Sequence, residues 1–252
     1  MTSTSSGGEH QSGDHPAPPR VALVTGANRG IGLAIAERLV ADGLRVVGTT
    51  RSAPPTTSVG IEWVTMDVTD DASVDAAFDW IEREVGPVEV LVANAGITKD
   101  GLALKMSTPD FATVLDTNLT GAFRVARRAV RKMVRARAGR IIFVSSVSGL
   151  IGQPGQANYA ASKAGLGGLA RSLAREVGSR SITVNIVAPG PVATEMFAAT
   201  DTAMAELIEA SVPLGRLAEP AEVAAAVAFL ASGDAGYITG HTLNVDGGLG
   251  MR

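Results

Sequence analysis

The chain of 252 residues has no cysteine, which excludes a disulfide framework, a thiolate metal site and a cysteine nucleophile. Its three histidines are His10, His15 and His241, and the first two lie in a polar N-terminal segment. We therefore expect neither a metal site nor a catalytic triad built on histidine.

Long apolar runs and an excess of positive charge are also missing. No uninterrupted apolar run is long enough to span a bilayer, and the formal net charge of −3 gives no electrostatic case for binding nucleic acid or an anionic membrane. Residues 1–19 are rich in Ser, Gly, Thr and Pro and lack the charged start and apolar centre of a signal peptide. We expect a disordered N-terminal extension here and a cytoplasmic location.

From Arg20 onward, short apolar runs rich in β-formers alternate with helical patterns. The predicted strands are Val21–Thr25, Leu44–Thr49, Ile61–Met66, Val88–Ala93, Arg140–Ser145, Ile182–Ala188 and Thr242–Val245. The predicted helices are Ile31–Asp42, Ala72–Val85, Pro109–Arg137, Asn158–Val177 and Pro220–Ala231, with Gly43 and Gly178 as helix stops. Apolar strands separated by helices predict one α/β domain over residues 20–252, a doubly wound parallel sheet (Rossmann fold) with helices on both faces. Such a sheet binds its ligand at the carboxyl ends of its strands.

A glycine-rich segment, Thr25-Gly26-Ala27-Asn28-Arg29-Gly30-Ile31-Gly32, follows the first predicted strand and opens the first predicted helix. Glycine permits a tight turn and a close approach of backbone to phosphate. The helix N-terminus presents free N–H groups and a positive dipole end to a pyrophosphate. An ordinary glycine-rich turn is the alternative, but the strand before the segment and the helix after it favour a dinucleotide-binding site.

The residues after the second predicted strand indicate which dinucleotide is bound. An Asp or Glu there would bind the ribose 2′-hydroxyl of NAD, whereas this chain has Thr49-Thr50-Arg51. Arg29 lies within the glycine loop, and two guanidinium groups near the ribose suit a 2′-phosphate. The alternative is that both arginines are only solvated. The pattern predicts NADP(H) as the cofactor.

Tyr159 and Lys163 are four residues apart on a predicted helix, so they share one face. A nearby ammonium favours the phenolate, and we expect Lys163 to lower the tyrosine pKa from its usual value of about 10. A phenol tuned in this way can act as a general acid or base. Most tyrosines at this spacing from a lysine are ordinary partly buried residues, so the rest of the chain has to decide between the two readings.

Five segments together resemble the short-chain dehydrogenase/reductase family, over roughly residues 20–252. They are Thr25–Gly32, Asn94-Ala95-Gly96, Asn118, Ser146 with Tyr159 and Lys163, and Pro189-Gly190. Within the family the chain is most similar to bacterial 3-oxoacyl-[acyl-carrier-protein] reductases, a match carried by residues 156–165, 237–240 and 245–248. The Asn28–Gly32 and Arg51 pattern is similar to the branch that elongates very long acyl chains.

The resemblance implies a catalytic role for four residues. Tyr159 would protonate the developing alkoxide, and Lys163 would lower the pKa of Tyr159 and hold the nicotinamide ribose. Ser146 would hydrogen-bond the substrate carbonyl, although Ser145 and Ser148 are competing hydroxyls that only the spacing excludes. Asn118 would kink its helix and hold a water that links Lys163 to solvent. The alternative for Asn118 is an ordinary polar residue on a helix face.

The resemblance also implies which residues contact the cofactor. In addition to the glycine loop, Arg51, Tyr159 and Lys163, they are Asp67, Val68, Asn94, Ala95, Gly96, Pro189, Gly190, Val192 and Thr194. Asp67 and Val68 would meet the adenine, residues 94–96 would pass behind the ribose, and residues 189–194 would lie beside the carboxamide. The alternatives are that Asp67 merely caps the following turn and that Pro189-Gly190 merely ends a strand.

By this resemblance the reaction would be the NADPH-dependent reduction of a 3-oxoacyl thioester presented by acyl carrier protein. Residues 191–213 are expected to form an apolar substrate lid. The basic stretch from Arg124 to Arg140 reads mainly as a solvated helix face, but Arg137 and Arg180 match family positions implicated in carrier docking. A homotetramer built on the Pro109 and Asn158 helices is the assembly that the family implies.

Two other readings stay open. The first is an NADP-dependent ketoreductase of the same family that acts on a polyketide or on a free ketone. The second is a non-catalytic NADP-binding regulator, which would often lack the tyrosine or the lysine that this chain keeps.

Overall fold

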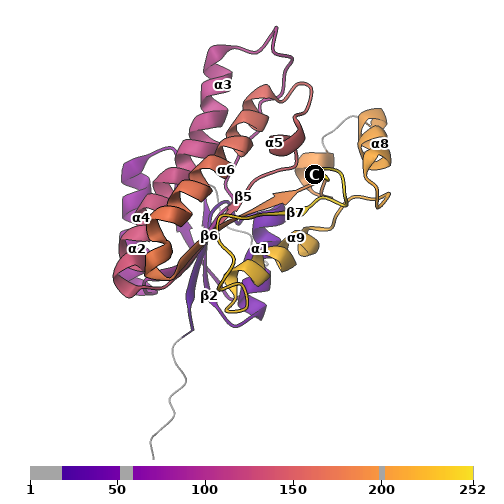
Figure 1. Cartoon of the computed structure of the whole chain (residues 1–252). Helices are drawn as coiled ribbons and strands as arrows, with labels where there is room; N and C mark the ends of the chain where they lie inside the picture. The colour runs from indigo at the N-terminus through magenta and orange to yellow at the C-terminus, as the bar shows by residue number, and fades with distance from the viewer. Residues whose placement is uncertain (1–18, 52–58, 199–201, 252) are drawn as a thin grey trace, which may run out of the picture.

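The computed structural model describes residues 19–51, 59–198 and 202–251, so the expected disorder of the N-terminal extension concerns residues that, apart from Pro19, lie outside the described part. Within these described residues, seven parallel strands form one sheet in the order β3-β2-β1-β4-β5-β6-β7 (Figure 1). They are β1 (Val21–Val24), β2 (Arg45–Thr50), β3 (Ile61–Thr65), β4 (Val88–Ala93), β5 (Gly139–Val144), β6 (Ile182–Pro189) and β7 (Thr242–Val245). All seven predicted strands are confirmed, with ends that differ by at most one residue.

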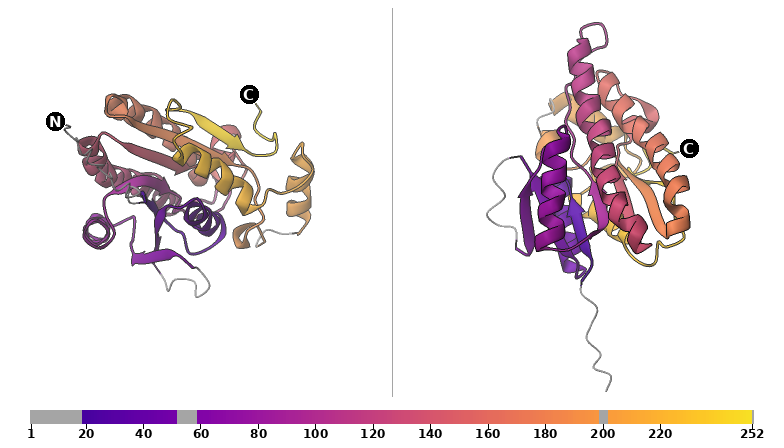
Figure 2. Two further views of the ribbon diagram at one scale, coloured as in Figure 1. Left: turned by 90° about the horizontal axis from the view of Figure 1, so that it is seen from below. Right: turned by 90° about the vertical axis from the view of Figure 1, so that its left-hand side faces the viewer.

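Helices cover both faces of the sheet, as the predicted doubly wound fold requires (Figure 2). One face carries α2 (Asp71–Glu84), α4 (Gly121–Ala136) and α6 (Ala157–Val177), and the other carries α1 (Gly30–Ala41) and α9 (Pro220–Ala231). The strands are buried on both sides, so the apolar residues form two separate clusters. Phe78, Met133 and Leu166 belong to the first cluster, and Ile35 and Val227 belong to the second.

The strand order sets the position of the site. The chain proceeds outward from β1 to β2 and β3 and then returns to place β4 on the other side of β1. The connections after β1 and β4 therefore diverge at the carboxyl edge and leave a crevice there, which is where open α/β sheets bind ligands.

The predicted helix over Pro109–Arg137 is wrong as a single α-helix. The structure has α3 (Thr108–Leu115), a π-helical turn η1 (Asp116–Thr120) and then α4. The predicted kink at Asn118 takes the form of this π-turn. Arg137 then ends α4 in the left-handed conformation, with φ of 55°.

Gly43 follows α1 with φ of +83°, as a helix stop requires, but Gly178 does not stop its helix in this way. Its φ is −57°, and it begins the short 3-10 helix η2 (Gly178–Arg180). The chain turns only at Ser181, whose φ is 56°. The short helices α5 (Ser148–Ile151), α7 (Glu195–Ala198) and α8 (Thr202–Ser211) were not predicted as separate elements.

Two absences apply to the part of the chain that the structure describes. None of its helices has the length and apolar character to cross a bilayer. It also brings no three His, Cys, Asp or Glu side chains together in a way that would hold a metal ion.

Candidate active site

A cavity of about 660 Å³ lies at the carboxyl edge of the sheet, in the crevice between the β1 and β4 connections. This volume is within the usual range for cofactor sites. The predicted cofactor residues that line it are Gly26, Asn28, Arg29, Gly30, Ile31, Gly32, Arg51, Asp67, Val68, Asn94, Ala95, Gly96, Tyr159, Lys163 and Thr194. Pro189, Gly190 and Val192 are not among the lining residues, and neither are Ser146 and Asn118. Ile97 and Glu195 line the cavity without having been predicted.

The glycine loop is shaped so that only glycine fits at key positions. Gly26 and Gly30 have φ of +63° and +54°, a region that side chains disfavour. A Cβ on Gly32 would clash with the Gly26 carbonyl oxygen and with the Asn94 side chain. The first turn of α1 thus lies directly against the loop at the cavity wall, in the arrangement that binds a pyrophosphate.

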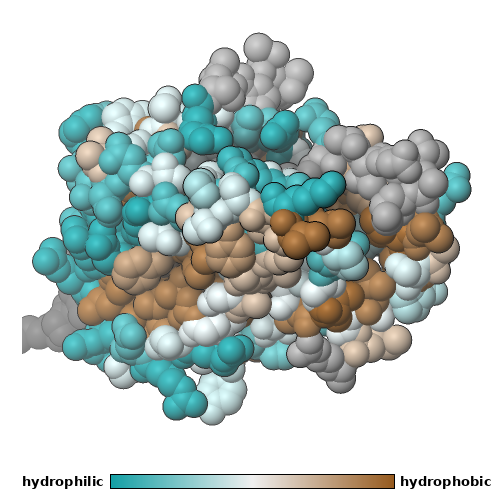
Figure 3. Space-filling model, turned by 90° about the horizontal axis from the view of Figure 1, so that it is seen from above, coloured by the Kyte–Doolittle hydropathy of each residue, from teal (hydrophilic) through white to brown (hydrophobic). Residues whose placement is uncertain are grey.

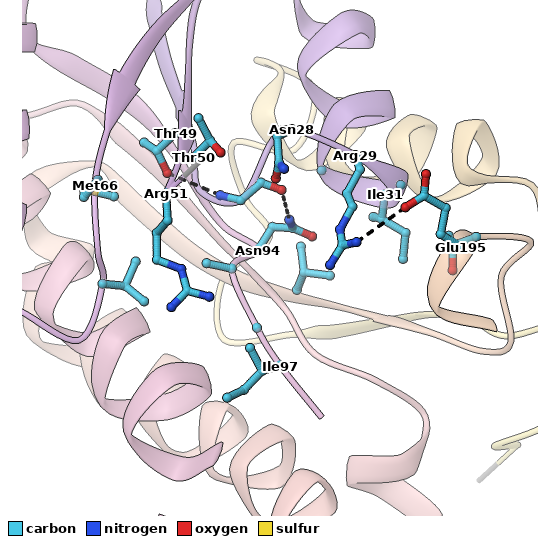
Figure 4. Close-up of a pocket in the computed structure, with 18 of the residues that line it drawn as sticks. Asn28, Arg29, Ile31, Thr49, Thr50, Arg51, Met66, Asn94, Ile97 and Glu195 are labelled. Carbon is cyan, nitrogen blue, oxygen red and sulfur yellow. Dashed lines mark hydrogen bonds and ion pairs between the residues drawn. The ribbon is translucent and has the colours of Figure 1, made fainter. Parts of the chain in front are cut away.

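Asn94 holds this loop in place from the end of β4. Its amide group donates to the carbonyl oxygens of Thr25 at 3.0 Å and Gly26 at 3.1 Å, and Figure 4 shows it pointing back toward the loop. The Thr25 hydroxyl in turn accepts from the backbone N–H groups of Asn94 and Ala95. The shape of the cavity floor is therefore fixed by bonds between two strand ends.

Both predicted phosphate-binding arginines reach the cavity, and each is paired weakly with a carboxylate. Arg29 Nη1 lies 3.4 Å from Glu195 Oε2 (Figure 4). Arg51 Nη1 lies 4.0 Å from Asp67 Oδ2. The arginine side chains are 68 % and 64 % exposed. Exposed ion pairs of this kind contribute little, so both guanidinium groups can re-pair with a phosphate at small cost.

Asp67 serves the local turn as well as the cavity. Its Oδ1 accepts from the backbone N–H of Thr69 at 2.9 Å and from the Thr69 hydroxyl at 2.8 Å. The bond from the Thr69 backbone is the main cause that lowers the pKa of Asp67, and the charges of Arg51 and Arg124 add to it. Asp67 therefore caps this turn and also lines the cavity, so capping and cofactor contact are compatible at this position.

Tyr159 and Lys163 lie in the first two turns of α6 and meet as their spacing predicts. The Lys163 ammonium is 5.6 Å from the centre of the Tyr159 ring and donates to the Val144 carbonyl oxygen at 2.8 Å. Lys163 is only 5 % exposed. Burial lowers its pKa to about 8 because desolvation disfavours the charged form.

The expectation that Lys163 lowers the pKa of Tyr159 is wrong for this arrangement. Burial is the largest effect and raises the tyrosine pKa, a hydrogen bond with Ser146 opposes the rise, and the charge of Asp100 adds to it. The ammonium lies beside the ring, so its charge does not offset the desolvation. Tyr159 therefore stays protonated near neutral pH, which is the form that a proton donor needs.

The three competing serines are separated by their hydrogen bonds. The Ser145 hydroxyl is buried and donates to the Lys163 carbonyl oxygen at 2.9 Å, so it is committed to the fold. Ser146 hydrogen-bonds with Tyr159, and its oxygen also accepts from the Ser148 N–H at 3.2 Å. Among these hydroxyls, Ser146 is the one placed to share an acceptor with Tyr159.

Asn118 reaches across from the π-turn to the segment after β4. Its Oδ1 accepts from the Ile97 N–H at 2.8 Å, and its Nδ2 donates to the Ile97 carbonyl oxygen and to Ser162 Oγ. A Cβ on Gly96 would lie 3.2 Å from Asn118 Oδ1 and 3.5 Å from Lys163 Nζ. Asn118 thus holds the backbone that lies against the lysine.

Sequence reasoning missed Asp100 and its neighbours, which connect the loop after β4 to the start of α6. Gln156 donates to Asp100 Oδ2 at 2.9 Å, and Asn158 donates to the Lys99 carbonyl oxygen at 2.8 Å. No local pattern marks these residues, because their contacts join two loops that are far apart in the sequence. Through them the charge of Asp100 comes close enough to affect Tyr159.

Four side chains of the basic stretch join α4 to α2, so the expectation of a solvated helix face is wrong for Arg124 and Arg128, which are only 17 % and 9 % exposed. Arg124, Arg127, Arg128 and Lys132 all pair with carboxylates of α2. Arg137 instead donates to the Ser179 carbonyl oxygen at 3.2 Å, which brings it next to Arg180. Arg137 ends α4 and Arg180 follows the last turn of α6. The contact with Ser179 places both at the far end of α6, about 30 Å from Tyr159 in its first turn.

Apolar surface surrounds the carboxyl edge of the sheet on the side where α8 lies (right side of Figure 3). Leu207 and Leu214 are each 67 % exposed, and Ile151 and Met251 are exposed as well. The Leu214 N–H donates to the Gly247 carbonyl oxygen, so the residue that directly follows the expected lid is held on the C-terminal turn. Met196 and Met204 fall within the expected lid at residues 191–213, but their side chains lie outside the described part.

Comparison with known proteins gives one decisive result. A family model described as "Enoyl-(Acyl carrier protein) reductase" matches residues 26–250. The chain belongs to the short-chain dehydrogenase/reductase family. The doubly wound sheet is the fold of this reductase family, whose cofactor is a nicotinamide dinucleotide.

Members of the family with curated names resemble the reductase along nearly its whole length. The 3-oxoacyl-[acyl-carrier-protein] reductase MabA of Mycobacterium tuberculosis (strain H37Rv) is 52 % identical, over 94 % of this chain and 95 % of that protein. The 3-oxoacyl-[acyl-carrier-protein] reductase FabG of Escherichia coli (strain K12) is 48 % identical, over 92 % and 98 %. The FabG of Salmonella typhimurium gives the same values.

Proposed function

We propose that this reductase converts a 3-oxoacyl-[acyl-carrier-protein] thioester to the 3-hydroxyacyl thioester in fatty acid biosynthesis, with NADPH as the reductant. The observation that carries the proposal is the Tyr159–Lys163 pair in the wall of the cofactor cavity, with the Lys163 ammonium 5.6 Å from the centre of the Tyr159 ring. The names and near-complete coverage of MabA and FabG support the choice of substrate.

In this proposal, bound NADPH supplies the hydride that the ketone carbon accepts. Tyr159 and Ser146 hydrogen-bond the ketone oxygen, and these donors stabilise the negative charge that develops there. Tyr159 then gives its proton to that oxygen. Lys163 lies beside the tyrosine ring with a pKa of about 8, so it can return a proton to Tyr159 near neutral pH. Asn118 holds residues 96–97 and, we propose, a water that connects Lys163 to solvent.

The residues of the cavity fit a nicotinamide dinucleotide. The glycines leave the backbone open to a pyrophosphate, and the exposed guanidinium groups of Arg29 and Arg51 can pair with a 2′-phosphate. We assign the adenine side to Asp67 and Val68, the ribose side to Asn94, Ala95 and Gly96, and the carboxamide side to residues 189–194. NADP(H) is the form that these charges favour.

Arg51→Gln should weaken NADPH binding by about ten-fold or more, because a hydrogen bond to a charged group contributes about 1.5–3 kcal/mol. NADH lacks the 2′-phosphate, so its Kd should change little. Fluorescence titration of both cofactors measures the two values. Arg38→Gln is the matched control, because Arg38 is an exposed α1 arginine paired with Asp42. If Arg51→Gln shifts neither Kd, the arginine is only solvated and the NADP assignment loses its basis.

The substrate itself is tested by NADPH oxidation with a panel of carbonyl compounds. Acetoacetyl and long-chain 3-oxoacyl thioesters should be reduced, and turnover should rise with acyl length if the apolar surface near α8 holds the chain. The panel includes trans-2-enoyl thioesters, because the family description names enoyl reduction, and unrelated ketones. Faster turnover of an enoyl thioester or a free ketone than of any 3-oxoacyl thioester would rule out the proposed substrate.

We propose carrier docking at Arg137 and Arg180, in keeping with an acidic partner. Within one subunit this patch is about 30 Å from Tyr159, so in the homotetramer that we also propose, it would serve a neighbouring active site. Reversing both charges should lower turnover of the carrier-bound substrate far more than turnover of a free thioester analogue. Equal losses with both substrates would contradict docking at this patch.

The proposal covers residues 20–252 as a single reductase domain that includes the substrate lid at 191–213. A cytoplasmic location suits an NADPH-dependent step and forms part of the proposal. The NADPH oxidation panel also separates the main alternatives, since a non-catalytic NADP-binding regulator would bind NADPH and reduce none of the substrates.

A further inference from the structure

Arg124 lies where three segments of the chain meet. It is in the first turn of α4, and its side chain is only 17 % exposed. Its Nη1 donates to Asp116 Oδ1 at 2.9 Å and to the Val68 carbonyl oxygen at 3.3 Å, and its Nε lies 3.4 Å from Asp71 Oδ2. One guanidinium therefore joins the start of the π-turn, the loop after β3 and the start of α2.

Two of these three segments belong to the site. Val68 lines the cofactor cavity, and Gly121 allows it to lie against the start of α4, since a Cβ there would come within 2.7 Å of Val68 Cγ2. Asp116 is the first residue of the π-turn that contains Asn118. Arg124 thus connects one wall of the cofactor cavity with the residue that holds the backbone beside Lys163.

The neighbouring arginines on α4 have other roles. Arg127 shares the Asp71 carboxylate with Arg124, but its side chain is 49 % exposed and lies over the Phe123 ring. Arg128 binds Asp79 and Glu82, so it joins α4 to α2. Among the described residues, the hydrogen bonds and ion pairs of these two arginines do not reach the π-turn or Val68, which makes Arg127 a close internal control for Arg124.

We propose that Arg124 is a positioning residue of the reductase, which sets the loop at Val68 and the π-turn at Asn118 relative to each other. It is not among the residues that line the cofactor cavity. It acts on cofactor binding through Val68 and on the proton-transfer step through Asn118. The second of these effects rests on the function proposed above, whereas the first concerns cofactor binding alone.

The test compares Arg124→Gln, Arg124→Lys, Asp116→Ala and the control Arg127→Gln in the full chain. Arg124→Gln loses charge-assisted hydrogen bonds to both segments, so we expect the Kd for NADPH to rise and kcat with a 3-oxoacyl thioester to fall, each by about ten-fold. Asp116→Ala removes only the hydrogen bond between Arg124 and the π-turn. It should therefore lower kcat while the Kd for NADPH stays near the wild-type value. In Arg124→Lys, the single ammonium can replace only one of the hydrogen bonds of the guanidinium at a time. This variant should therefore recover part of the lost NADPH affinity and part of the lost kcat.

A pH profile adds a measurement that a purely structural role would leave unchanged. Displacement of Asn118 alters the surroundings of Lys163, so the pH dependence of kcat should shift in Arg124→Gln and Asp116→Ala but not in Arg127→Gln. Thermal unfolding of each variant reports the loss of stability separately.

The positioning role is overturned if Arg124→Gln and Arg127→Gln give the same Kd, kcat and pH profile, whatever their unfolding temperatures. It is also overturned if Asp116→Ala leaves kcat unchanged. A wild-type protein that reduces no 3-oxoacyl thioester would overturn the proposed function instead. In that case, a comparison of the Kd for NADPH between Arg124→Gln and Arg127→Gln still tests whether Arg124 supports cofactor binding.

Discussion

Tyr159→Phe should lower kcat for 3-oxoacyl thioester reduction by about 10²–10⁴-fold, the usual contribution of a general acid. The variant removes one hydroxyl and keeps the aromatic ring beside Lys163, so the fold and the cofactor cavity should stay intact. The Kd for NADPH should therefore remain close to the wild-type value. Steady-state turnover and a fluorescence titration on the same protein sample measure the two quantities.

The chain offers a matched control for this variant. It contains only two tyrosines, and the other one, Tyr237, is fully exposed on the loop before β7. Tyr237→Phe removes the same hydroxyl from a residue outside the cavity, so it should leave turnover unchanged. Equal turnover of Tyr159→Phe and the wild type would show that the proton comes from another group.

Lys163→Met should lower kcat by at least about 10²-fold and should also change how stability depends on pH. In the folded protein, burial lowers the pKa of Lys163 to about 8, whereas an unfolded chain keeps this proton up to about pH 10.4. Between these values the unfolded state binds more protons, so Lys163 makes the free energy of unfolding rise with pH. The rise is roughly 1.4 kcal/mol per pH unit within this window.

Chemical denaturation of the wild type and Lys163→Met at several pH values from about 7.5 to 10 isolates this contribution. All other titrating groups are common to both proteins, so the difference between their free energies of unfolding reports Lys163. The wild type should gain stability relative to the variant as pH rises. Lys105→Met is the control, because it removes an ammonium that lies exposed in the loop before α3 instead of in the cavity. A difference that stays constant with pH would contradict a desolvated lysine.

Local patterns in the sequence were sufficient to predict the strands of the sheet, the glycine loop and the Tyr159–Lys163 pair. The strands of a parallel sheet are continuous apolar runs, and each run stops where a polar loop begins. The sequence therefore predicts the strand ends to within one residue. The glycine loop and the Tyr159–Lys163 pair depend on spacing within a single turn or helix. For this reason their side chains lie in the cavity as expected.

Contacts between distant segments account for what the sequence could not predict. The helical pattern continues through residues 109–137, and the π-turn within it depends on the bonds that Asn118 makes with Ile97. The roles of Arg124 and Asp100 depend in the same way on loops that only the fold brings together. The direction of the Tyr159 pKa shift was predicted wrongly because burial, which a spacing argument ignores, exceeds the effect of the nearby ammonium.

The central claim is that Tyr159 delivers the proton while the ketone carbon of a 3-oxoacyl thioester receives a hydride from NADPH in this cavity. The most direct test uses NADPH deuterated at the transferable position of its nicotinamide ring, with mass analysis of the acyl product. The account predicts a 3-hydroxyacyl thioester with deuterium on C3 from the wild type and only traces of it from Tyr159→Phe. A wild-type protein that binds NADPH but leaves no deuterium on C3, or a Tyr159→Phe variant that labels C3 at the wild-type rate, would contradict it.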